Sequence, residues 1–134
     1  MSKPTIQSTQ RRRLFALLLV LAAILFAVAL SRSAYDLTSP DTLPFHLFVR
    51  KAYSIVAFAI LGYLFGEMRA EAGRPARPLV GGGVVGLFSL CIEIAQHFAG
   101  SQEGHRSNLA DVEFGIIGGA IGAAIALVRR GLTV

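Results

Sequence analysis

Residues 109–128, LADVEFGIIGGAIGAAIALV, carry the strongest structural signal in the sequence. The run contains no charged residue after Asp111 and Glu113, and its length matches the roughly 20 residues that a helix needs to cross a bilayer. Because hydrocarbon offers no water to the backbone, a segment that crosses it must pair its own N–H and C=O groups. The run therefore predicts a transmembrane helix.

Four glycines of this run fall at positions i, i+3, i+4 and i+7 and so share one face of the predicted helix: Gly115, Gly118, Gly119 and Gly122. A face without side chains lets another backbone approach closely, and such packing drives the association of helices in lipid. The run at residues 79–98 carries a matching row of small residues, Gly82, Gly86 and Ser89. We therefore expect these two helices to pack on each other through their small residues.

The composition of the whole chain agrees with a membrane environment. Hydrophobic residues make up 54% of the 134 residues and charged residues 16%, whereas about a quarter of the residues in a soluble domain are charged. Four apolar runs of spanning length lie at about residues 14–31, 47–67, 79–98 and 109–128. The sequence predicts a single all-α domain over residues 1–134, an integral membrane bundle of four helices.

Lysine and arginine are distributed unevenly between the two sides that this topology creates. One side holds Lys3, Arg11, Arg12, Arg13, Arg69, Arg74, Arg77, Arg129 and Arg130, and the other holds Arg32, Arg50, Lys51 and Arg106. Cytoplasmic segments carry the excess of basic residues in membrane proteins, so we expect both termini in the cytoplasm. Because these residues flank apolar runs, the net charge of +5 indicates topology rather than a nucleic-acid partner.

Ionisable side chains are concentrated near the outer ends of the predicted helices, while the inner halves are almost purely apolar in sequence. Glu93 lies inside an apolar run, and a carboxylate at that depth is costly unless it is paired or hydrated, which makes it a functional candidate. The candidate binding residues at this end are Arg50, Lys51, Glu93, Gln96, Arg106 and Asp111. The alternative is that Glu93 pairs with a neighbouring basic residue only to hold the helices together.

The sequence contains no metal-ligand spacing, nucleophile motif or phosphate-binding loop, so we expect no metal, no cofactor and no catalytic residue. An enzyme would have to use Glu93 or Asp111 as its general acid or base, assisted by His97 or His105. The single cysteine, Cys91, lies in an apolar run, where we expect a small buried side chain.

Two groups of short motifs occur in order along residues 43–128. The first is Val49-Arg50-Lys51 followed by AILGYL at residues 59–64. The second is Glu93-x-x-Gln96-x-Phe98, then Arg106, Asp111-Val112, Gly118 and Gly122. In these motifs the chain resembles the VanZ-like family. The resemblance implies a small multi-helix protein of the bacterial cytoplasmic membrane, whose founding member is associated with resistance to the glycopeptide teicoplanin.

The chain departs from the family pattern at the site that the resemblance implies. Ser54, Ala57 and Phe58 stand where the family usually has histidine, glutamate and an aromatic hydroxyl, and Gly115 stands where it often has Asn or Asp. These losses favour a non-catalytic accessory subunit, packed among lipid and other subunits of a larger membrane complex. The alternative is an outer-leaflet binding module for an anionic lipid headgroup, a cell-envelope fragment or a glycopeptide. The third hypothesis is a membrane-embedded enzyme.

Overall fold

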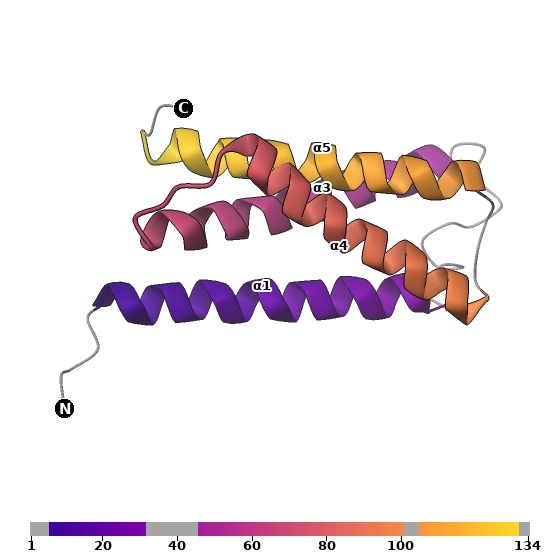
Figure 1. Cartoon of the computed structure of the whole chain (residues 1–134), viewed down its shortest axis with the longest axis horizontal. Coiled ribbons are helices and arrows are strands. Elements are labelled where there is room, and N and C mark those ends of the chain that lie inside the picture. The colour runs from indigo at the N-terminus through magenta and orange to yellow at the C-terminus, as the bar shows by residue number, and fades with distance from the viewer. Residues whose placement is uncertain (1–5, 32–45, 101–104, 132–134) are drawn as a thin grey trace.

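In a computed structural model the chain forms four α-helices, α1 (Ile6–Leu30), α3 (His46–Glu71), α4 (Pro78–Ala99) and α5 (His105–Arg129) (Figure 1). The structure describes residues 6–31, 46–100 and 105–131, without the side chains of residues 6, 7, 46, 47, 50 and 105–108. Across these residues there is no strand, and all four helices are long and apolar enough to cross a membrane. The predicted all-α architecture is confirmed, with four helices that have the length and hydropathy needed to span a membrane.

The helices extend past the apolar runs at most of their ends. α1 begins at Ile6 and includes residues 11–13, because arginine is a good helix former and its long side chain can reach the membrane surface. α4 has Pro78 in its first turn, where the missing N–H would have had no helical partner. α4 stops at Gly100, whose positive φ of 68° turns its N–H onto the carbonyl of Gln96.

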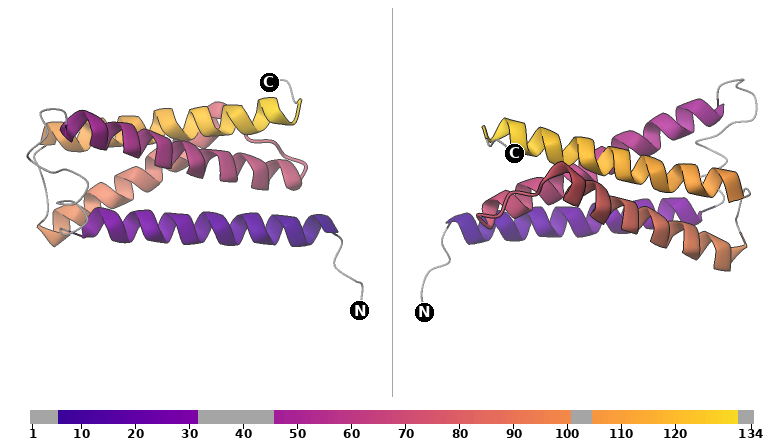
Figure 2. Two further views of the ribbon diagram at one scale, coloured as in Figure 1. Left: turned by 180° about the vertical axis from the view of Figure 1, so that it is seen from behind. Right: turned by 45° about the horizontal axis from the view of Figure 1, so that its top comes forward.

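Helix α5 packs mainly against α3 and α4 and lies on the side of the bundle away from α1 (Figures 1 and 2). α1 packs against α3 and α4 through Leu18, Leu21 and Leu25, which lie on a core that includes Leu61 and Val85. No residue in the apolar stretch of α1 is buried. The three later helices therefore form the tight part of the fold, and α1 is peripheral to them.

Helix α4 crosses the bundle obliquely. Its first half runs beside α5, and its second half diverges toward the end of α1 (Figure 1). There the side-chain nitrogen of Gln96 donates a hydrogen bond of 2.8 Å to the backbone carbonyl of Ala29. α1 begins and α5 ends at the opposite end of the bundle, which we call the terminal end (Figure 2).

The glycines of α5 line two interfaces rather than the single one expected from their shared face. A Cβ atom on Gly118 would lie 2.8 Å from a backbone carbonyl oxygen of α3. A Cβ atom on Gly115 would instead lie 2.6 Å from the Cβ of Ser89 on α4. Gly122 lies at the α3 interface with Gly118, and Gly119 lies at the α4 interface with Gly115. The glycine-rich face of α5 is thus divided between two neighbours.

The helices on either side of α5 contribute small residues as well. On α4, Gly82 and Gly86 pack against Ile116 of α5. On α3, Gly62 and Gly66 pack against the small residues of α5, a pair that the sequence analysis did not identify. With glycine on both sides, the backbones approach closely and gain dispersion contacts, which hold helices together where lipid removes the hydrophobic driving force.

The closest of these contacts gives a test by alanine substitution. A Cβ atom at Gly122 would lie 2.5 Å from the backbone nitrogen of Tyr63, so Gly122→Ala must push α3 and α5 apart. We expect a loss of about 1–3 kcal/mol in the free energy of unfolding, as for other overpacked sites. The measurement is reversible unfolding of the purified protein in detergent micelles.

Gly83→Ala is the matched control, because among the described residues no atom outside the local turn of α4 lies within 4 Å of a Cβ built there. Since alanine is the better helix former by up to about 1 kcal/mol, this variant should be neutral or more stable than the wild type. Equal destabilisation by the two substitutions would contradict the close-packing argument.

Candidate functional site

A cavity of about 210 Å³ lies between all four helices, in the half of the bundle away from the terminal end. It occurs where α4 diverges from α5. The wider separation of the helices leaves a space between their side chains. One part of its wall is apolar and includes Leu25, Phe58 and Ile92. Polar side chains form the other part: Tyr53, Ser54, Ser89, Glu93, Gln96 and Asp111.

Two of these polar residues are buried within the span of α4. Ser89 is 2% exposed and Glu93 is 7% exposed. The hydroxyl of Ser89 donates a hydrogen bond of 2.9 Å to the backbone carbonyl of Asp111 and so fixes the start of α5 against α4. Burying a carboxylate and a hydroxyl among apolar helices is costly unless they are hydrogen-bonded, which makes this polar wall a specialised region of the protein.

The structure brings three of the six predicted binding residues to this cavity, namely Glu93, Gln96 and Asp111. Lys51 lies nearby at the same end of the bundle, with its ammonium 5.7 Å from the centre of the Phe114 ring, a cation–π contact. The side chains of the other two predicted residues, Arg50 and Arg106, lie outside the described part of the chain.

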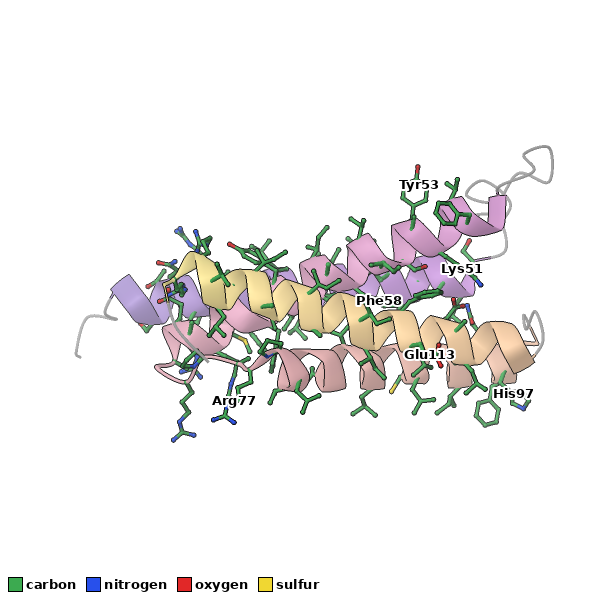
Figure 3. The ribbon with its side chains drawn as sticks, turned by 90° about the horizontal axis from the view of Figure 1, so that it is seen from above. Lys51, Tyr53, Phe58, Arg77, His97 and Glu113 are labelled. Atoms are coloured by element: carbon green, nitrogen blue, oxygen red, sulfur yellow. The ribbon has the colours of Figure 1, made fainter. Side chains whose placement is uncertain are left out.

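Other residues singled out in the sequence lie on the outside of the bundle. Figure 3 shows His97 and Glu113 in the same half as Lys51 and far from Arg77. His97 is exposed, packs edge-to-face on Phe98 and does not line the cavity. The prediction that Cys91 is buried is wrong, because its side chain is exposed on the surface of α4. Among the described residues no group of His, Cys, Asp and Glu could hold a metal ion.

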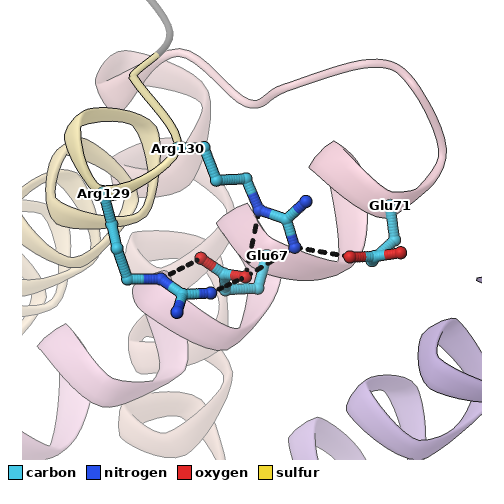
Figure 4. Close-up of polar contacts among 4 residues, drawn as sticks. All are labelled: Glu67, Glu71, Arg129 and Arg130. Atoms are coloured by element: carbon cyan, nitrogen blue, oxygen red, sulfur yellow. Dashed lines mark hydrogen bonds and ion pairs between the residues drawn. The ribbon is translucent and has the colours of Figure 1, made fainter.

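The terminal end contains a second polar cluster, made by α3 and α5 (Figure 4). Glu67 is 2% exposed. It accepts hydrogen bonds from Arg129 at 3.1 and 2.7 Å and from Arg130 at 3.1 and 2.7 Å. Arg130 also bonds to Glu71 at 2.5 Å. The two guanidinium groups therefore balance the negative charges of two carboxylates, the buried one of Glu67 and the neighbouring one of Glu71.

This cluster corrects the expectation that the inner halves of the helices are apolar. Arg129 also lies over the ring of Tyr63, at 5.8 Å from its centre. The hydrogen bond to Glu67 raises the pKa of Arg130 most, and the hydrogen bond to Glu71 raises it further. The guanidinium group of Arg130 therefore stays charged. The spacing of Glu67 and Glu71, one helical turn apart, together with two adjacent arginines at the end of α5, could have indicated this cluster from the sequence.

The ion cluster leads to a prediction about stability. Glu67→Gln leaves two arginines without their shared carboxylate and should lower the free energy of unfolding by about 2–4 kcal/mol. Glu71→Gln removes a single contact to Arg130 and should cost about 1 kcal/mol or less. Unfolding in detergent measures both. If Glu67→Gln is no worse than Glu71→Gln, the cluster does not stabilise the α3–α5 interface.

Comparison with known proteins adds no relative to these observations. No family model, no curated protein sequence and no solved structure that was compared with the chain matches it. The function must therefore be argued from the cavity and its residues.

Proposed function

We propose that this protein is a non-catalytic membrane protein that binds the polar head of a lipid or of a lipid-linked cell-envelope fragment in the cavity between its four helices. The observation that carries this proposal is the buried carboxylate of Glu93, 7% exposed, in the wall of a 210 Å³ cavity within the spans. Ionisable groups at such positions are retained mainly for function, because they oppose insertion into the bilayer.

The lining favours a particular kind of head group. Both charged residues that line the cavity within the described part of the chain, Glu93 and Asp111, are carboxylates. Ser54 and Gln96 add neutral hydrogen-bonding groups. Carboxylates accept hydrogen bonds, so a head group rich in hydroxyl, amide or ammonium donors fits this wall better than a purely anionic one. The apolar wall suits the first carbons of an attached chain.

The competing hypotheses receive less support from the geometry. An enzyme that used His97 to assist Glu93 or Asp111 is not supported, because His97 is exposed and does not line the cavity. An accessory subunit needs an apolar surface, and large exposed side chains such as Phe98 and Leu79 provide one. Lipid contacts explain such side chains equally well, whereas a buried polar cavity requires a ligand or water.

We further propose that the protein is VanZ-like and resides in the bacterial cytoplasmic membrane with both termini in the cytoplasm. The uneven distribution of lysine and arginine supports this orientation. The cavity then lies in the outer half of the membrane. Molecules of the outer leaflet are therefore its candidate ligands.

The binding proposal is tested by identifying what the protein retains. We expect wild-type protein extracted into polymer nanodiscs to carry a specific envelope lipid or lipid-linked molecule, detected by mass spectrometry. Ala57→Leu should fill part of the cavity, which Ala57 lines. Glu93→Gln removes a charged acceptor, and losing such a hydrogen bond should lower retention roughly tenfold or more.

Gly83→Ala serves as the control on the lipid-facing side of α4 and should retain the molecule as the wild type does. Identical recovered molecules in the wild type and in both cavity variants would remove the binding proposal. Recovery of a partner protein in constant proportion from all variants would favour the accessory-subunit hypothesis instead.

The orientation has its own test, motivated by the basic residues at the terminal end. Reporters fused after Ala72 and at the C-terminus should report a cytoplasmic location, because both follow helices that end among arginines. A reporter fused after Gly100 should report the opposite side. A reversed signal at any of the three sites would overturn the proposed topology.

A further inference from the structure

A second cavity, of about 510 Å³, lies at the terminal end between the first turns of α1 and the last turns of α3. Three arginines line it: Arg11 and Arg12 from α1, and Arg69 from α3. Phe15 and Met68 form its apolar side. This cavity is separate from the polar one in the other half of the bundle, and none of its residues lines both.

The positive charge of this second cavity is not balanced by the protein residues that the structure describes. The carboxylates of the neighbouring α3 turns, Glu67 and Glu71, are engaged by Arg129 and Arg130. Within residues 6–31, 46–100 and 105–131 the three cavity arginines form no ion pair. Three guanidinium groups around one hollow repel one another unless an anion lies between them.

Arg69 shows most directly that a partner is missing. Its Nε atom is buried and has no hydrogen-bond partner among the described residues. A buried donor without an acceptor costs free energy, and the cost is larger for a charged group. Because Arg69 lines the cavity, an acceptor bound there would lie next to this guanidinium group. Because guanidinium presents donors in a planar fork, the oxygens of a phosphate group match it in charge and geometry.

We propose that this second cavity binds the phosphate group of an anionic phospholipid, with the half-buried Arg69 as one donor and Arg11 and Arg12 closing over the head group. The position at the helix ends is the level of lipid head groups, and basic pockets between spanning helices are suited to such lipids. Phe15 and Met68 contact the start of the lipid's apolar part. In the proposed orientation the bound lipid belongs to the cytoplasmic leaflet, where anionic lipids attract basic residues.

Native mass spectrometry of the full-length protein with equal amounts of phosphatidylglycerol and phosphatidylcholine tests this site. Wild-type protein should retain phosphatidylglycerol in preference. Arg11→Gln/Arg12→Gln should weaken its binding roughly tenfold or more, because it removes charge-assisted hydrogen bonds to the phosphate group. Arg69→Gln should weaken it as well. The double variant changes exposed residues of α1, so it should fold normally even if Arg69→Gln does not.

The control is Arg74→Gln/Arg77→Gln, which removes the same charge from exposed positions of the same end that do not line the cavity. This control should change phosphatidylglycerol binding by less than about twofold, because salt screens the nonspecific attraction between exposed arginines and an anionic lipid. Equal losses in both double variants would overturn the site in favour of diffuse attraction. Millimolar inorganic phosphate should not displace the lipid. If it does, and stabilises the protein by itself, the ligand is free phosphate and the lipid assignment is wrong.

Discussion

Direct contact between backbones at the glycines of α5 is the constraint on which the rest of this structure depends. In lipid, apolar side chains gain little by leaving one apolar surface for another, so helices associate through dispersion and close approach. Gly118 and Gly122 bring α3 against α5, and Gly115 and Gly119 bring α4 against it. Two neighbours therefore converge on one helix. The close approach of α3 and α4 to α5 at these glycines determines where a cavity can remain between the helices.

That space is the polar cavity. α4 is held to α5 by small residues as far as Ser89 and diverges beyond it, where Glu93 and Gln96 line the cavity. α1 forms one wall of the cavity and is fixed there by the hydrogen bond that Gln96 donates to the carbonyl of Ala29. Along α4, the row of small residues that packs on α5 thus continues as the polar row that lines the cavity. Close packing and a polar cavity wall therefore follow one another along α4.

The sequence predicted the spans well because a spanning helix needs a long apolar run, and length and hydropathy are local properties. The sequence predicted a face of small residues on α5. It did not predict that α3 and α4 share this face, because the path of α3 is not a local property of the sequence. Glu93, Gln96 and Asp111 were found as candidates because polar residues stand out within apolar runs. The ion cluster was missed because basic residues were counted as topology signals, and counting does not reveal that Glu67 and Arg129 meet across two helices.

The pairing of Glu67 with α5 has a consequence for biosynthesis. α3 leaves the ribosome well before α5, so for that interval Glu67 has neither of its arginines and the glycines of α3 have no neighbour to cover them. An uncompensated carboxylate draws the end of a helix toward the aqueous interface. We therefore expect α3 to remain at the translocon, or bound to a chaperone, until α5 has been synthesised. α1 has no fully buried residue in its apolar stretch and no charged residue from Leu14 to Leu30, so it can enter the bilayer before its partners are made.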